Sequence, residues 1–190
     1  MLISKFENHN VSEEILNLER EYNIFLPKEY KDFLCRYNGG YTPKTKIKAG
    51  KISSDIRGFY GVGNVALSLN TLELQEWIHK KIMPIATDSF GNYFAIGLCD
   101  DISGKIFFFD HEVGYRGEYI AESLKAFLQY CKSDRISEAS RRSIEEREAA
   151  LIANGRGDVI TDDLRRMWQA EIDKYGNMVQ EEVVINSNKY

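Results

Sequence analysis

Apolar residues near the N-terminus recur with the spacing of two amphipathic helices. They stand three or four positions apart, first at Val11, Ile15, Leu18 and Tyr22 and then at Tyr30, Phe33, Leu34 and Tyr37. Asn10 followed by Glu13 predicts a capping box at the start of the first helix. Pro27 suits the first position of the second helix, because its missing N–H costs nothing there. The Asn-Gly-Gly sequence at 38–40 predicts the end of that helix, since Asn and Gly tolerate a left-handed backbone.

The middle of the chain alternates instead with the period of β-strands. Residues 44–49 place a lysine at every second position, which predicts an exposed edge strand. A second short strand is expected at 56–60. Three apolar runs separated by turn residues then predict an antiparallel meander. The runs lie at 83–86, 93–98 and 105–110. With a short helix after Asn70 and another at 122–131, we expect an α+β fold with four to six mainly antiparallel strands flanked by helices.

The composition changes after residue 132. Up to that point the chain has 12 Lys and 4 Arg, and after it 2 Lys and 7 Arg with only three aromatic residues. A segment so poor in aromatic residues cannot build a large core of its own. We therefore predict a domain at 1–132 and a C-terminal helical extension at 133–190, with helices at 137–153 and 161–175 and a strand at 183–185.

The second helix of the extension has an apolar stripe that must be covered. It consists of Leu164, Trp168, Ile172 and Tyr175. Packing on the body of the same chain or on a second copy would cover it. The protein is therefore expected to be a monomer, or a homodimer formed through the extension.

Bulk composition is that of an ordinary globular chain. The 190 residues are 43% hydrophobic, with a net charge of −4 and a pI near 5.5, which disfavours direct binding of nucleic acid. The three cysteines lack the spacing of a disulfide framework or a zinc site, so each is expected to be a small core residue. We find neither a signal peptide nor a run of about 20 apolar residues that could span a bilayer. These features predict a cytoplasmic protein with no membrane association.

Motifs for catalysis are weak throughout the chain. The Gly-Val-Gly segment at 61–63 is half of a dinucleotide fingerprint and lacks its third glycine, so it predicts a plain turn. The Asp-His-Glu sequence at 110–112 holds residue types that bind metals or transfer protons. Neighbouring strand residues point to opposite faces, however, so one strand cannot direct all three at one ion. No serine lies in a nucleophile elbow. We predict no catalytic residues, no metal site and no cofactor.

Acidic and aromatic residues near the predicted turns form a candidate recognition surface. Asp88, Asp100 and Asp101 are expected at related ends of the sheet, where carboxylates could steer a basic partner. The aromatic residues least needed for a periodic core would be buried at the interface. They are Tyr41, Phe59, Tyr60 and Tyr115. The alternative is that these are ordinary turn acids and aromatic residues at the edge of the core.

Three motifs, in order along the chain, resemble those of one protein family. The helix near residues 27–37 has the sequence LPKEYKDFL and ends in YNGG. Residues 83–98 contain a strand, an Asp-x-x-Gly-Asn turn and a second strand, and 104–112 contain a strand that ends in Asp-His-Glu. Together they resemble the SUKH superfamily, which includes the yeast cell-wall synthesis regulator and many bacterial toxin-immunity proteins.

The resemblance implies an α+β fold and a non-enzymatic, partner-binding protein. In bacteria such domains are typically immunity proteins that bind a cognate toxin, often a nuclease, and block it. The expected partner is therefore a toxin protein. Two other interpretations stay open: a regulatory scaffold like the yeast relative, and a ligand-binding protein with a cleft near Asp88. A toxin gene beside this one would favour immunity.

Overall fold

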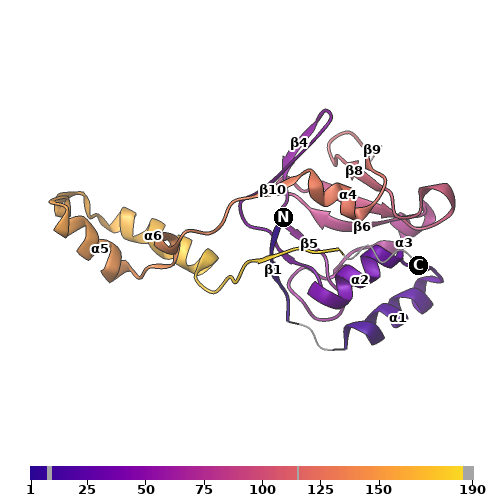
Figure 1. Ribbon diagram of the computed structural model, residues 1–190, viewed down its shortest axis with the longest axis horizontal. Helices are drawn as coiled ribbons and strands as arrows, with labels where there is room; N and C mark the ends of the chain where they lie inside the picture. The colour runs from indigo at the N-terminus through magenta and orange to yellow at the C-terminus, as the bar shows by residue number, and fades with distance from the viewer. Residues whose placement is uncertain (8–9, 115, 186–190) are drawn as a thin grey trace. The chain divides into compact units, whose positions relative to one another are not determined.

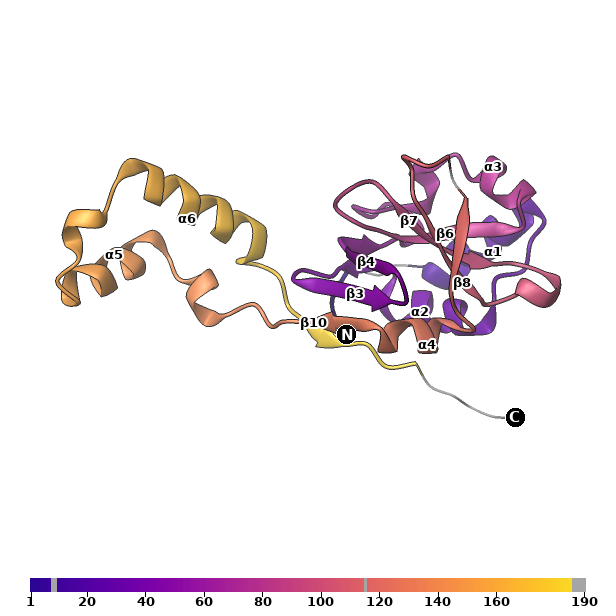
Figure 2. The same cartoon turned by 90° about the horizontal axis from the view of Figure 1, so that it is seen from above.

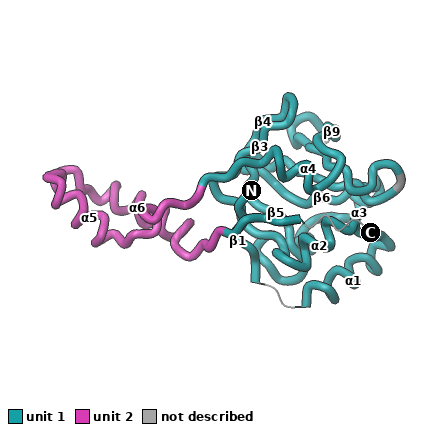
Figure 3. Tube along the Cα trace, in the orientation of Figure 1, with its two compact units in different colours: residues 1–134, 181–190 teal, residues 135–180 magenta. Residues whose placement is uncertain are grey.

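A computed structural model of the protein describes residues 1–7, 10–114 and 116–185, apart from the side chain of Asp100. Two compact units make up the chain (Figure 3). Unit 1 holds residues 1–134 together with the described residues from 181 onward, and unit 2 holds residues 135–180. The strand predicted at 183–185 does not form, and the chain returns to unit 1 through a strand at Glu181–Glu182 instead. The division into a domain at 1–132 and an extension at 133–190 stays a prediction.

Unit 1 is built on an eight-stranded antiparallel sheet, which confirms the α+β fold class (Figure 1). In order across the sheet, its strands are β11 (Glu181–Glu182), β1 (Leu2–Lys5), β2 (Gly40–Tyr41), β5 (Gly58–Phe59), β6 (Ile82–Thr87), β7 (Tyr93–Gly97), β8 (Ile106–Phe109) and β9 (Gly117–Ala121). The predicted meander is confirmed as β6, β7 and β8. The expected four to six strands are too few, because β2, β5 and β11 have two residues each and leave no periodic signal.

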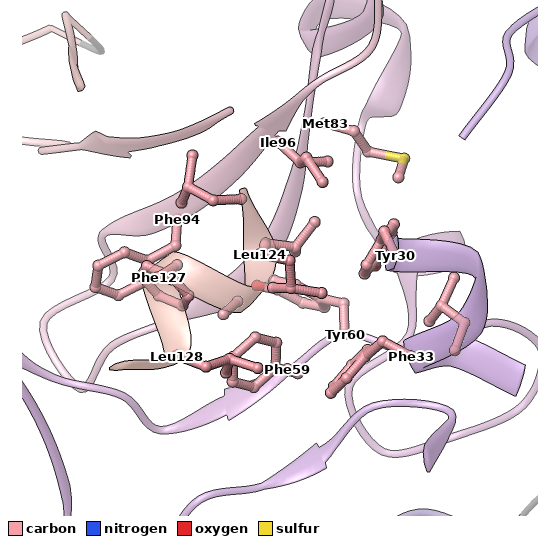
Figure 4. Packing of buried hydrophobic residues seen from close by; sticks show 14 of the residues in the cluster. Tyr30, Phe33, Phe59, Tyr60, Met83, Phe94, Ile96, Leu124, Phe127 and Leu128 are labelled. Carbon is pink, nitrogen blue, oxygen red and sulfur yellow. The ribbon is translucent and has the colours of Figure 1, made fainter. Parts of the chain in front are cut away.

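Helices and sheet enclose the main aromatic core of unit 1, and a smaller cluster around Phe109 is separate from it. The helices are α1 (Val11–Tyr22), α2 (Lys28–Tyr37), α3 (Leu74–His79) and α4 (Leu124–Gln129), with short 3-10 turns at Leu69–Thr71 and Asp100–Ile102. The predicted apolar stripe of α2 is fully buried. Phe33 of α2 and Phe127 of α4 converge on Phe59 of β5, with ring centroids 5.1 and 6.3 Å from that of Phe59 (Figure 4). Burying each of these rings stabilises the fold by about 1.5–3 kcal/mol.

The C-terminal end of α2 is fixed to the loop at 61–63. Asn38 ends the helix with a left-handed φ of 48°, as predicted. Its Nδ2 donates to the carbonyl oxygen of Val62 at 3.1 Å, and its Oδ1 accepts from the Val62 N–H at 2.9 Å. Gly39 then passes so close to β5 that a Cβ atom would lie 2.6 Å from the Phe59 carbonyl oxygen. The Gly-Val-Gly segment is therefore a structural turn that receives the end of α2.

A second sheet of three antiparallel strands adjoins the first within unit 1 (Figure 2). Its order is β10 (Cys131–Ser133), β3 (Thr45–Ala49), β4 (Ile52–Asp55). The lysines of β3 alternate with buried residues, as predicted. The prediction of an edge strand is wrong, however, because the chain after α4 pairs β10 with β3. The helix expected at 122–131 consequently ends at Gln129, and only Gly58 and Phe59 of the strand expected at 56–60 form a strand, β5.

Both N-terminal helices begin differently from the prediction. Asn10 is the N-cap of α1, but its backbone is left-handed and its side chain makes no capping hydrogen bond. A capping side chain normally extends from a β-region backbone, so the predicted capping box with Glu13 is wrong. Pro27 is the N-cap of α2, with ψ of 139°, and precedes the first helical residue.

Unit 2 contains two α-helices among its described residues. They are α5 (Ile144–Ala153) and α6 (Asp162–Tyr175), with 3-10 turns at Glu138–Arg141 and Gly157–Val159. α6 matches its prediction and is capped by Thr161, whose Oγ accepts from the Leu164 N–H at 3.2 Å. α5 begins later than predicted, because Ser143 and Glu146 form a capping box there.

The apolar stripe of α6 is half-buried inside unit 2. Arg147 of α5 places its guanidinium 5.9 Å from the ring centroid of Trp168, and its Nη1 lies 2.8 Å from Glu171 Oε2. These contacts hold the two helices together. Whether the protein is a monomer or a homodimer stays a prediction.

Candidate partner-binding surface

The turn between β6 and β7 is held by the carboxylate of Asp88, which is only 2% exposed. Its Oδ1 accepts hydrogen bonds from the backbone N–H groups of Phe90 at 2.9 Å and Asn92 at 2.8 Å. Its Oδ2 accepts from Ser54 Oγ at 2.7 Å and from Asn92 Nδ2 at 2.8 Å. A buried carboxylate with four donors is well satisfied, and charge-assisted bonds of this kind fix the geometry of the turn.

A second layer of hydrogen bonds ties this turn to neighbouring strands. Asn92 Oδ1 accepts from the backbone N–H of His111 at 3.1 Å and lies 2.8 Å from the ring Nδ1 of the same residue. Asp55, the last residue of β4, accepts from the N–H of Ser89 at 2.9 Å and from its hydroxyl at 2.5 Å. The Asp-x-x-Gly-Asn and Asp-His-Glu motifs are therefore parts of one structural network.

Beside this network lies a groove of about 480 Å³. Ser53 of β4, Phe108 of β8 and Glu118 of β9 line it. Phe90 and Val113 also line it and are 70% and 67% exposed. Since β4 and β9 are the last strands of their respective sheets, the groove runs between two sheet edges. A smaller hollow of about 200 Å³ continues between the β3–β4 turn and β9.

Phe90 stands on a turn whose backbone is held on both sides. The N–H groups of Ser89, Phe90 and Asn92 are all bound by carboxylates. An exposed aromatic side chain on a preorganised backbone loses little conformational freedom when a partner buries it, as at the anchors of protein interfaces. We call the surface formed by Ser53, Ser54, Phe90, Val113 and Glu118 the Phe90 groove.

Three residues of the predicted recognition surface lie inside the fold. Phe59 is 0% exposed, Tyr60 6% and Asp88 2%. Burial raises the pKa of Tyr60 to about 12, with the neighbouring Tyr93 adding to the shift. None of the three can touch a partner without local unfolding. For them the alternative interpretation, as core and turn residues, agrees with the structure.

The expected cluster of three turn aspartates does not form. Asp88 precedes β7 whereas Asp100 and Asp101 follow it, and successive turns of an antiparallel meander lie at opposite ends of their shared strand. Asp101 is exposed and Tyr41 is half-buried, so a binding role for these two stays a prediction. Tyr115 lies outside the described residues.

Potentially reactive groups are dispersed over the described chain. No three His, Cys, Asp or Glu residues within it come together as a metal-binding group. Cys131 is buried, and this burial raises the pKa of its thiol to about 12. Cys35 was expected in the core but is exposed, because it follows Leu34 by one position and so points away from the stripe that α2 buries. Cys99 is partly buried.

Sequence reasoning missed Phe90 and Val113. One signal could have identified Phe90: it is a large aromatic residue inside a tight turn between two buried strands. A side chain at such a position has no place in the core and is therefore exposed. Val113 lies between β8 and β9, and β9 itself was not predicted, so the groove could not be anticipated.

Comparison with known proteins places these motifs in a family. The SPbeta prophage-derived uncharacterized protein YokK of Bacillus subtilis (strain 168) is 29% identical over 149 residues, which cover 65% of this chain and 76% of that protein. Within the described residues, no helix has the length and apolar character needed to cross a bilayer. The sequence profile of the SMI1/KNR4 family (SUKH-1) matches residues 11–130, from the start of α1 to just past α4. Because this match covers more than half of the chain, the protein belongs to the SMI1/KNR4 family (SUKH-1), as its three motifs indicated.

Proposed function

We propose that this protein is a non-enzymatic binding module, an immunity protein that binds and neutralises a cognate toxin. Membership of the SUKH-1 family supports the proposal, since the family includes immunity proteins. The observation that carries it is the Phe90 groove, in which the exposed ring of Phe90 stands on a turn fixed by a satisfied hydrogen-bond network. Such a protein would act in the cytoplasm of the cell that makes the toxin.

Neutralisation by binding requires no chemical reaction. A stable interface buries about 1,600 Å² in total, so the groove would form the centre of a larger contact. Phe90 would enter a pocket of the toxin, with Val113 beside it and the polar side chains of β4 and β9 at the rim. The complex would then cover the toxin's active site or hold the toxin in an inactive conformation.

A ligand-binding function is the second candidate. The observation that favours it is the size of the groove, about 480 Å³, which falls within the range of about 300–1,000 Å³ typical of small-molecule sites. A regulatory scaffold that joins other cellular proteins is an alternative within the binding class. A toxin gene directly beside this one would favour immunity over both.

Co-expression with the product of the neighbouring gene tests the proposal. Wild-type protein should restore growth that the neighbouring gene product alone prevents. Phe90→Ala should weaken this rescue, because it removes the exposed anchor and leaves the buried network in place. Phe25→Ala is the matched control, since Phe25 is 81% exposed in the turn between α1 and α2. Equal rescue by the two variants would show that the groove is not the binding surface, and lack of rescue by wild-type protein would refute neutralisation of that toxin.

A further inference from the structure

One face of the three-stranded sheet carries three lysines. Lys46 lies directly opposite Asp55 on β4 and Lys132 on β10, while Lys48 lies opposite Ser53. Residues directly opposite each other project from the same face of a sheet. All three lysines are exposed, whereas the intervening residues of β3 are buried. We call Lys46, Lys48 and Lys132 the lysine face.

The ammonium groups of the lysine face have no partner among the described residues. The same is true of Lys51, at the turn between β3 and β4. The carboxylate of Asp55, which lies opposite Lys46, accepts hydrogen bonds from Ser89 through both of its oxygens. The other described lysines all interact with a neighbouring group. They are Lys5, Lys31 and Lys105 in ion pairs, Lys80 and Lys174 against aromatic rings, and Lys28, Lys44, Lys81 and Lys125.

The pairing of Lys46 with Lys132 is unfavourable for folding. Like charges directly opposite each other on neighbouring strands destabilise a sheet. Asp55, opposite Lys46 on the other side, offsets only part of this repulsion, because its single charge faces three lysines. In a chain with a net charge of −4, three exposed lysines around one carboxylate form a local excess of positive charge. A negatively charged partner would relieve the repulsion between the two lysines.

We propose that the lysine face binds an acidic surface of the partner protein, next to the contact made by the Phe90 groove. The two surfaces are continuous, because Lys51 and Ser53 of the β3–β4 hairpin also line the groove. The proposal rests on the proposed function, which supplies a protein as the partner. A protein fits better than nucleic acid for two reasons. Asp55 lies on the same face, where a continuous row of phosphates would be repelled, and the adjoining groove exposes apolar side chains.

Binding to poly-L-glutamate tests the charge preference without the toxin. The full chain is compared with a variant that reverses the lysine face: Lys46→Glu, Lys48→Glu, Lys132→Glu. The matched control changes the net charge equally at three exposed lysines on or beside helices: Lys28→Glu, Lys80→Glu, Lys125→Glu. Duplex DNA and vesicles containing phosphatidylserine are tested as competing classes of partner.

Wild-type protein and the control variant should bind poly-L-glutamate, with an affinity that falls as salt is added. The lysine-face variant should bind roughly tenfold more weakly, equivalent to about 1.4 kcal/mol. Equal binding by the two variants, or no binding by wild-type protein, would overturn the proposal. Tighter binding of DNA or of vesicles than of poly-L-glutamate would also overturn it and favour that class. Because no toxin is used, failure here leaves the growth-rescue result standing.

The single substitution Lys132→Glu separates binding from folding. It places a carboxylate opposite Lys46, so the thermal midpoint should rise as repulsion becomes attraction. Affinity for poly-L-glutamate should fall in the same variant, because the face loses two units of positive charge. Opposite changes in stability and affinity support the proposal. Unchanged or higher affinity would contradict it.

Discussion

Replacing Gly39 by alanine should destabilise unit 1 strongly, because two separate costs meet at this residue. Its φ of +74° lies in the left-handed region, which costs a residue with a Cβ about 1–2 kcal/mol. The new Cβ would also lie 2.6 Å from the backbone nitrogen of Gly61 and from the Phe59 carbonyl oxygen. Backbone atoms cannot rotate away, so the chain must shift, at about 1–3 kcal/mol. The expected loss is about 2–5 kcal/mol, against a total stability of about 5–15 kcal/mol for a typical domain.

Gly50→Ala provides the matched control. Gly50 has a similar φ of +59°, but no heavy atom lies within 4 Å of the position that its Cβ would take. This variant therefore carries the conformational cost of about 1–2 kcal/mol without the steric one. The difference between the two variants isolates the close approach between the end of α2 and the β5 segment, and we expect it to be about 1–3 kcal/mol.

Urea unfolding measures this difference directly. A Trp168→Phe background leaves Trp77 as the one tryptophan of the chain, so its fluorescence reports on unit 1. With a urea slope of about 1–3 kcal/mol per molar, the midpoint of Gly39→Ala should lie roughly 1 M below that of Gly50→Ala. Equal midpoints for the two variants would refute the reasoning, because they would show that the close backbone contact at Gly39 imposes no constraint.

Three further predictions concern the core of unit 1. Leu34→Ala should cost about 2–5 kcal/mol in urea unfolding, because Leu34 is 0% exposed and its truncation leaves a cavity; an unchanged midpoint would contradict its place in the core. Tyr30→Phe should raise the midpoint, because the Tyr30 hydroxyl is buried without a hydrogen-bond partner among the described residues, an arrangement that costs about 1–3 kcal/mol; a lower midpoint would contradict this. Burial holds the pKa of the Cys131 thiol near 12, above its ordinary value of 9.0. The folded state therefore favours the neutral thiol, and the contribution of this thiol to the free energy of unfolding is complete below pH about 9 and is lost as the pH rises toward 12. A Cys131→Ala variant should lose less stability over that range than wild-type protein, and an identical pH dependence would refute the assignment.

The sequence predicted those elements whose signal is local. α1 and α2 bury stripes with helical spacing, α6 half-buries such a stripe, and β6 to β8 are apolar runs between turn residues. Elements defined by distant pairing were missed or misplaced. β3 alternates as an edge strand would, yet β10 pairs with it from more than 80 residues away. β11 is held to β1 from the far end of the chain, and no local pattern could reveal either pairing.

The candidate site shows the same limit for single residues. The sequence identified Asp88 as a turn residue, but it could not show that Ser54 of β4, from the other sheet, donates a hydrogen bond to its buried carboxylate. The Phe90 groove exists because β4 and β9 are each the last strand of their sheet, and no local sequence pattern reveals that position. Residue type therefore indicated the turn, whereas the tertiary arrangement decided which side chain of the turn is exposed, namely Phe90, and which is buried, namely Asp88.

The most direct test of the account is to purify the product of the gene beside this one, titrate it with this protein and measure how much of its toxic activity remains. A binding inhibitor acts by occupancy, so activity should fall in proportion to added protein and reach its minimum at an equimolar ratio. The same plot should result however long the two are incubated. Loss of activity at a small fraction of the equimolar amount, progressing with time, would show that the protein acts catalytically and would contradict neutralisation by binding.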